Sequence, residues 1–202
     1  ATLDNALMPF TDEHCSLARD AIQDMEKGGA VVIDSTNLCT ALPDRDVMLY
    51  EFQQCLNAYL SSTSPSQPIR SLLDIIHFYA KHPKEGLKYG MSILLDAQFL
   101  ASHALTDPVY IDARMKCIDL ARHGLDRIFS EYELDLLVTP MFSGLAPVSG
   151  YPSICVPAGY CSDGTPYGIT FIGRAYDEPR LIAAAYAYEQ ISRRRKQPVF
   201  AV

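Results

Sequence analysis

The stretches GYPSICVPAGY, residues 150–160, and YGITFIG, residues 167–173, decide the fold. Apolar and β-branched residues dominate both, and the Asp163-Gly164 pair between them is a turn signal. We therefore predict two neighbouring strands joined by a short connection. The first stretch also contains two prolines and two glycines, which favour interrupted pairing and close backbone approach over a regular central strand.

Two further apolar runs predict strands upstream. The run LDLLVTP at residues 134–140 predicts a buried strand that ends at Pro140. The run AVVID at residues 30–34 predicts another, after a helix over residues 11–29 that ends at two glycines. A helix, a glycine stop and an apolar strand in succession are typical of α/β proteins. The predicted fold class is α/β: a mixed β-sheet flanked by helices in three α/β/α layers.

The remaining segments predict helices and one loop. Helical spacing is found at residues 45–60, 71–83, 90–102, 107–132 and 177–196. In the longest helix we expect the apolar stripe to face the core; it consists of Ile111, Met115, Ile118, Leu125 and Ile128. The serine-rich segment at about residues 61–69 predicts a flexible loop.

Composition excludes several classes of protein. The chain has 202 residues, 49% of them hydrophobic, and a formal net charge of −7, which disfavours a nucleic-acid partner. No apolar run is long enough for a membrane span, and the beginning of the chain does not resemble a signal peptide. We therefore expect a cytoplasmic protein. The one basic run, residues 193–196, suits a helix end, with a patch for phosphate or an acidic partner as the alternative.

The residues alone do not predict a catalytic or metal centre. Six cysteines occur without a C-x-x-C pair, and His77 and His82 are spaced to face different sides of a helix, so we expect no metal. No cofactor motif is present, and neither Ser143 nor Ser149 lies in a G-x-S-x-G elbow. Cys155 is interpreted as a small core residue rather than a nucleophile.

Longer motifs carry a family resemblance. The block GYPSICVPAGY is followed by D-G-x-P-x-G-I-x-F-x-G-R-A at residues 163–175 and by E-P-x-L at residues 178–181. This succession resembles the C-terminal part of the amidase signature family, and looser similarity extends upstream over nearly the whole chain. The resemblance implies that residues 1–202 form a C-terminal portion of an amidase signature domain, the C-terminal half of that fold.

The resemblance also implies where the catalytic residues of the family lie. The family uses a nucleophilic serine, a second serine on a cis peptide bond and a lysine, all in the half that precedes the part seen here. The only Ser-Ser pair, Ser61-Ser62, has no flanking glycine, so no catalytic residue is assigned. A full-length relative would convert a small-molecule amide and water to a carboxylate and ammonia or an amine through an acyl-serine, without a cofactor. This chain alone is expected to be catalytically inactive.

A substrate pocket is the remaining candidate site. On the family's pattern, we expect Met141, Phe142, Gly150, Tyr151 and Pro152 to edge the pocket. The alternative is that these residues only set a turn and pack the core. Met91 stands where relatives often have glutamine, which leaves the substrate class open.

Two other functions stay open from the sequence. One is the glutaminase component of an amidotransferase, which passes ammonia to a partner protein. The other is a non-catalytic pseudo-amidase that acts as a scaffold or binding module. In each case we expect an exposed apolar face, which self-association or a partner covers.

Overall fold

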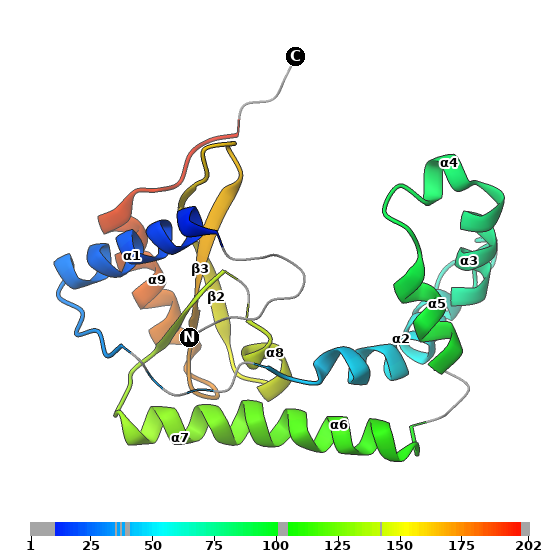
Figure 1. The fold of residues 1–202 in the computed structure, drawn as a ribbon, viewed down its shortest axis with the longest axis horizontal. Coiled ribbons are helices and arrows are strands. Elements are labelled where there is room, and N and C mark those ends of the chain that lie inside the picture. Colours follow the sequence, from blue (N-terminus) through cyan, green and yellow to red (C-terminus); the bar gives the residue numbers. More distant parts are fainter. Residues whose placement is uncertain are drawn as a thin grey trace. The chain divides into compact units, whose positions relative to one another are not determined.

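A computed structural model describes residues 11–34, 36, 38, 41–100, 105–141 and 143–198 of the chain (Figure 1). The described residues divide into two compact units. The sheet unit comprises those up to Leu42 together with those from Cys117 onward. The helical unit comprises those from Pro43 to Lys116. Each unit is described separately below.

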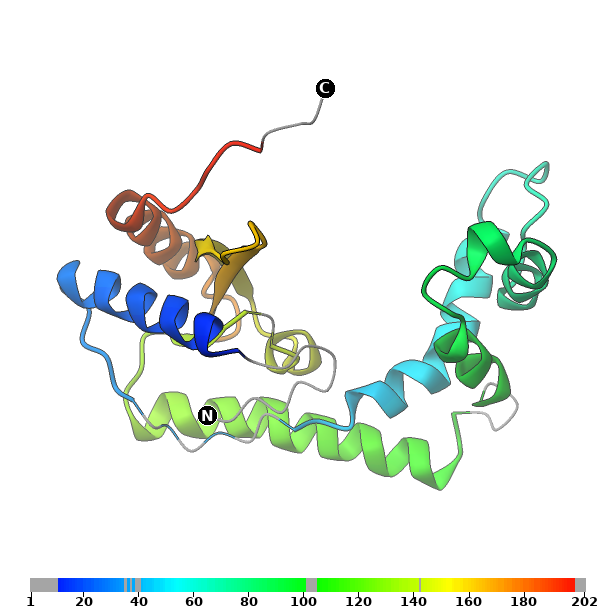
Figure 2. The same cartoon turned by 45° about the horizontal axis from the view of Figure 1, so that its top comes forward.

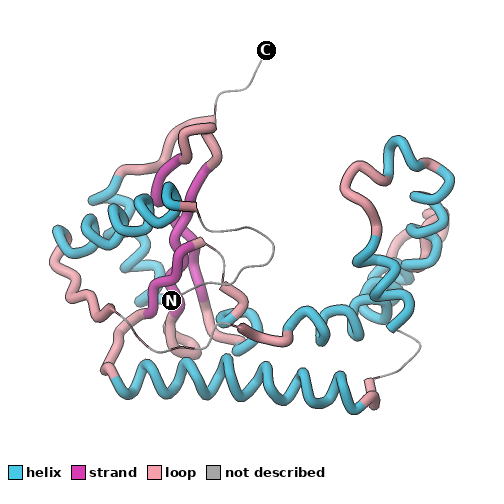
Figure 3. The backbone as a smooth tube through the Cα atoms, in the orientation of Figure 1, coloured by secondary structure: helices cyan, strands magenta, loops and turns pink. Residues whose placement is uncertain are grey.

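The sheet unit is built on a small antiparallel sheet (Figure 3). Its described strands are β1 (Leu137–Pro140), β2 (Ser153–Tyr160) and β3 (Pro166–Ile172), in the order β1-β3-β2. Both β1 and β2 pair antiparallel with β3, so they run parallel to each other on its two sides. The strands predicted around residues 134–140, 150–160 and 167–173 are thus confirmed.

The prolines and glycines of β2 mark an irregularity in its pairing. The register with β3 shifts between Pro157 and Gly159. A Cβ atom on Gly159 would come within 2.7 Å of the Leu17 Cδ2 atom, so the missing side chain lets the helix α1 (Asp12–Lys27) lie close to the strand.

Helices cover both faces of the sheet. On one face α1 and α9 (Glu178–Ser192) lie side by side (Figures 1 and 2) and pack against alternate strand residues such as Val156, Ile169 and Phe171. On the other face α7 (Gly124–Glu131) and α8 (Leu145–Ser149) pack against Leu137 and Ile172. The predicted three-layer α/β/α arrangement is confirmed.

The basic run ends α9 as expected and also joins α9 to α1. Arg193 is the C-cap of α9, in a left-handed conformation with φ 47°. Arg194 turns back and donates from Nη2 to Asp24 Oδ2 of α1 at 2.7 Å, while Lys27 Nζ lies 3.2 Å from Asp24 Oδ1. Asp24 is only 8% exposed, so this contact fixes the spacing of the two helices from within their interface.

Two expectations in the sheet unit are wrong. Residues 30–34 form no strand, and Val31 is 91% exposed and Ile33 44% exposed (Figure 3). An apolar run becomes a buried strand only where a neighbouring strand satisfies its backbone, and none of the described strands pairs with this run. Cys155, expected in the core, is exposed because its face of β2 lies outside the contact with α1 and α9.

The helical unit packs short helices around their apolar sides. It contains α2 (Asp44–Ser61), α3 (Leu72–Lys81), α4 (Pro83–Gly86), α5 (Ser92–Leu100) and the start of α6 (Pro108–Ile118). A core cluster of Leu49, Leu72, Ile76 and Ala97 holds α2, α3 and α5 together. Two tyrosine–carboxylate hydrogen bonds tie α2 to the beginning of α6: Tyr50 donates to Asp107 at 3.1 Å and Tyr110 to Glu51 at 2.6 Å.

Arg70 organises the serine-rich segment between α2 and α3. Its Nη1 atom donates to the carbonyl oxygens of Thr63 and Ser64 at 3.3 and 3.1 Å, and its Nη2 atom to that of Ser61 at 3.1 Å. These carbonyls follow the end of a helix, where backbone acceptors lack intrahelical partners. The guanidinium therefore takes the place of a C-terminal cap.

The long predicted helix contains a π-turn. Residues 108–131 are helical throughout, but residues Asp119–His123 form a π-helical segment, η2, between α6 and α7. A π-turn inserts one extra residue, so the residues after it are rotated about the helix axis by about 100° relative to a regular α-helix. As a result the predicted core stripe is confirmed only in its second half: Leu125 and Ile128 are buried, whereas Ile111, Met115 and Ile118 are exposed.

Candidate functional site

The connection between β1 and β2, residues 141–152, carries all five sequence-predicted pocket residues. Because β1 and β2 run parallel to each other on the two sides of β3, this connection must cross one face of the sheet. It does so on the face opposite α1 and α9, where α8 buries Leu145 and Ala146 against Ile172. Phe142 lies outside the described residues, so only the other candidates can be placed.

Met141 begins the connection in a strained conformation. Its φ of 52° lies in the left-handed region, which is uncommon for residues other than glycine. Its N–H donates to the Gly168 carbonyl at 2.9 Å, and its own carbonyl accepts from Thr170 Oγ1 at 2.5 Å. Met141 is thus bound to β3 through both of its backbone polar groups.

Gly150 ends α8 and turns the chain toward β2. Its φ of 76° makes it the left-handed C-cap of α8, the conformation in which glycine has no steric penalty. Its N–H donates to the Ala146 carbonyl at 3.0 Å, and a Cβ atom here would meet only Arg122 Nη2, at 4.0 Å. Gly150 is exposed, so its backbone is accessible to solvent in this structure.

The Tyr151 side chain is directed to helix α7. Its hydroxyl donates to Asp126, and its ring packs on the core cluster formed by α7, α8 and Ile172. Burial and the hydrogen bond to Asp126 raise the pKa of the Tyr151 hydroxyl, so it remains a donor at neutral pH. The next residue, Pro152, accepts from the Gly173 N–H at 3.0 Å.

The candidates therefore lie at two places along β3. Met141 is bound beside Gly168, and Pro152 is bound beside Gly173. Five residues of strand separate these anchor points, or roughly 17 Å at about 3.4 Å per residue. Gly150, Tyr151 and Pro152 form one group at the start of β2, and Met141 forms the opposite end of the same crossing.

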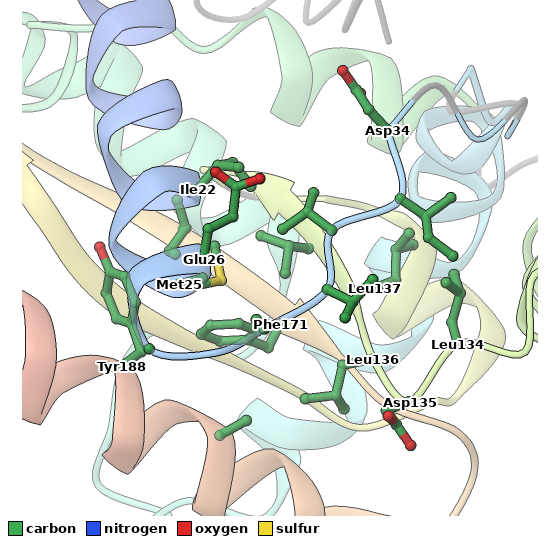
Figure 4. A pocket seen from close by; sticks show the side chains of 18 of the residues that line it. Ile22, Met25, Glu26, Asp34, Leu134, Asp135, Leu136, Leu137, Phe171 and Tyr188 are labelled. Carbon is green, nitrogen blue, oxygen red and sulfur yellow. The ribbon is translucent and has the colours of Figure 1, made fainter.

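A broad groove lies beside β1, on the face of the sheet that α1 and α9 cover. It has a volume of about 1150 Å³ and is lined by α1, residues 28–34, residues 132–138 and α9 (Figure 4). Its walls are mostly apolar, with Ile22, Leu136 and Phe171 among them, and acidic side chains lie around it, including Glu26 and Asp135. The sequence-predicted pocket residues do not line it, and the strand pattern of residues 30–34 was the only sequence signal for it.

No group of three or more His, Cys, Asp or Glu side chains in the described residues is arranged to bind a metal. Ser61 and Ser62, the only adjacent serines, donate to the carbonyls of Ala58 and Tyr59 at 2.6 Å each and extend the end of α2. Among the described helices, none combines the length and apolar content that crossing a membrane requires.

The chain is similar to known amidases. No family model matches the chain. A protein of Arabidopsis thaliana described as a probable amidase is 34% identical over 201 residues, which is 93% of this chain and 38% of that protein. The crystal structure of the peptide amidase from Stenotrophomonas maltophilia superimposes with a TM-score of 0.75 at 37% identity, over 93% of this chain and 42% of that one.

The chain belongs to the amidase signature family. It spans about two fifths of the length of these amidase relatives. A shorter match, 41% identical over 61 residues, is to a component of the glutamyl-tRNA(Gln) amidotransferase of Parvibaculum lavamentivorans and covers 30% of this chain. The family resemblance drawn from the motifs at residues 150–190 is thereby confirmed, and so is the α/β fold of an amidase signature C-terminal part.

Proposed function

We propose that this chain is the C-terminal, pocket-forming part of an amidase signature hydrolase. The observation that carries the proposal is the incomplete sheet unit. Among the described strands β1 pairs only with β3, so its other edge is open. Val31 and Ile33 are exposed beside a groove of about 1150 Å³. A monomer rarely leaves so much apolar surface open, so a further segment is needed to cover it.

We propose one occupant for this groove, the remainder of the amidase signature domain. The relatives are more than twice as long as the matched region, so a segment of the required size exists in them. An added strand would satisfy the outer backbone groups of β1, and its apolar side chains would bury Leu136 and Val138. When this segment is absent, we expect copies of the chain to self-associate through the same surface.

In the proposed enzyme the missing segment supplies the catalytic serines and lysine. A serine hydroxyl attacks the amide carbon only when a base takes its proton, and the oxyanion needs nearby N–H donors. The tetrahedral intermediate then expels ammonia or an amine, and water releases the acid from the acyl-serine. The present residues would form walls: Met141 at one end of the crossing, and Gly150, Tyr151 and Pro152 at the other.

The amidotransferase alternative has weaker support. Similarity to an amidase extends over 201 residues, whereas amidotransferase components match over shorter stretches, 95 residues in one case and 61 in another. We therefore propose hydrolysis of a small-molecule amide, with no second protein receiving the ammonia. A reducing, cytoplasmic location fits the free thiols of the described cysteines.

The test compares residues 1–202 with the complete product of the native coding sequence. Each is assayed for ammonia release from primary amides, peptide amides and glutamine, and each is treated with a serine-directed phosphonate probe. We expect hydrolysis and labelling by the complete product alone. Labelling of the 202-residue chain, or a complete product that hydrolyses no amide, would refute the proposal; preference for glutamine would favour the amidotransferase.

A second measurement tests the groove. Sedimentation of residues 1–202 at micromolar concentration should show self-association, and Val31→Asp should weaken it because the charge would be buried. Val109→Asp is the matched control, since Val109 is 59% exposed but lies in the helical unit. A stable monomer, or equal effects of the two variants, would contradict the proposed covering of the groove.

A further inference from the structure

The backbone of the strained turn at Met141 is hydrogen-bonded to β3 at two points. A left-handed conformation at a non-glycine residue persists only where its surroundings fix it. The Gly168 carbonyl binds the Met141 N–H at 2.9 Å, and the Thr170 hydroxyl binds the Met141 carbonyl at 2.5 Å. Backbone pairing alone would supply the first bond, whereas the second depends on a single side chain.

Thr170 is well placed to act as a fixed anchor. It lies on the central strand of the described sheet, opposite Thr139 of β1 and Cys155 of β2. Its residue is 7% exposed, so its side chain has little freedom to reach another acceptor. β-branched side chains are also stiff about the first side-chain torsion, which favours one direction for the hydroxyl group.

We propose that Thr170 is a positioning residue for the pocket-forming connection. Its hydroxyl holds Met141 in the left-handed conformation and so sets the direction in which residues 141–149 leave β1 and cross the sheet. This inference rests on the proposed function, in which that connection borders the amide substrate. Thr170 itself touches no reacting atom in this scheme.

Thr139 provides a matched control within the same row of the sheet. It has the same residue type and the same 7% exposure, and it faces the same side of the sheet as Thr170. In the part of the chain that the structure describes, its Oγ1 atom is buried without a hydrogen-bond partner. Thr139→Val therefore removes an equivalent hydroxyl from the same region and leaves the bond to Met141 intact.

The experiment uses the complete gene product with Thr170→Val, Thr170→Ser or Thr139→Val. Valine keeps the shape of threonine without the hydroxyl, and serine keeps the hydroxyl. Hydrogen exchange measured on peptides from residues 141–149 reports how firmly the backbone of the connection is held. The values of kcat and KM report whether the pocket still positions the substrate. We expect Thr170→Val to exchange faster there and to lower kcat/KM by about 10- to 100-fold, as misplaced substrate contacts do.

Thr170→Ser should recover most of both properties, and Thr139→Val should resemble the wild type in both. Unchanged exchange in Thr170→Val would overturn the inference whatever the activity. Faster exchange with unchanged kcat and KM would overturn the pocket role. A wild-type product that hydrolyses no amide would refute the proposed function and the pocket role with it, whereas exchange would still decide whether Thr170 holds the connection.

Discussion

The contact of Arg194 with Asp24 should contribute measurably to stability. Arg194→Ala removes a charged hydrogen bond of 2.7 Å from a carboxylate whose residue is 8% exposed. Such bonds contribute about 1.5–3 kcal/mol to the free energy of unfolding. Lys27 remains 3.2 Å from the same carboxylate, but its side chain is 68% exposed and compensates little. We therefore expect a loss of about 2 kcal/mol.

The assay is urea denaturation of residues 1–202 at one fixed protein concentration, because self-association would shift the midpoint. With a slope of about 2 kcal/mol per molar urea, the midpoint should fall by about 1 M. Arg195→Ala is the control, since Arg195 carries the same charge beside Arg194 but is exposed. A loss below about 0.5 kcal/mol for Arg194→Ala, or equal losses in both variants, would refute the reasoning.

The same contact predicts a pH dependence. Burial by itself raises the pKa of Asp24, but the hydrogen bonds and charges of Arg194 and Lys27 outweigh it and leave that pKa below its usual value. A carboxyl with a lowered folded-state pKa stabilises the protein above its unfolded pKa of about 3.9, and this contribution is lost as the pH falls further. The difference between wild type and Arg194→Ala should therefore be constant from about pH 7 to pH 5 and shrink below about pH 4.

Three other substitutions test local features of the fold and the pocket. Gly168→Ala would place its Cβ 2.7 Å from the Cys155 Sγ atom and should cost about 1–3 kcal/mol by urea denaturation, and less in a Cys155→Ala background. Arg70→Ala should speed hydrogen exchange over residues 61–69; equally fast exchange in the wild type would instead show that the loop is flexible as expected from its composition. In the complete enzyme, Tyr151→Ala should raise KM if Tyr151 edges the pocket, and lowered stability with unchanged kinetics would show a purely structural role.

Local signals predicted most elements because their causes are local. The helix predicted over residues 11–29 is observed as Asp12–Lys27, since a threonine cap and a glycine stop act within a few residues. The same holds for the hairpin of β2 and β3, whose turn residues lie between the two strands. Motifs at residues 150–190 also indicated the family, because they extend over enough positions to be specific.

The errors concern features set by distant partners. The apolar run at residues 30–34 indicates burial, but whether it forms a strand depends on a neighbour that the run does not encode. The π-turn at Asp119–His123 has no residue signature of its own, so the faces of the long helix could not be phased across it. At the candidate site, no local pattern indicated the contact between Tyr151 and Asp126, which are 25 positions apart.

The short length of β1 limits what can pair with its outer edge. The Met141 N–H points to β3, so by the alternation of an antiparallel pair those of Thr139 and Leu137 do as well. Pro140 has no amide hydrogen, which leaves Val138 as the only donor of β1 on its outer edge, and the chain turns away at Met141. Fibrillar aggregation requires long, flat edges on which copies add without limit. Pairing with an edge this short contributes little binding free energy by itself. Stable binding therefore needs a partner that also fills the adjoining groove. We expect overexpression of the chain alone to yield small oligomers that dissociate on dilution rather than fibres.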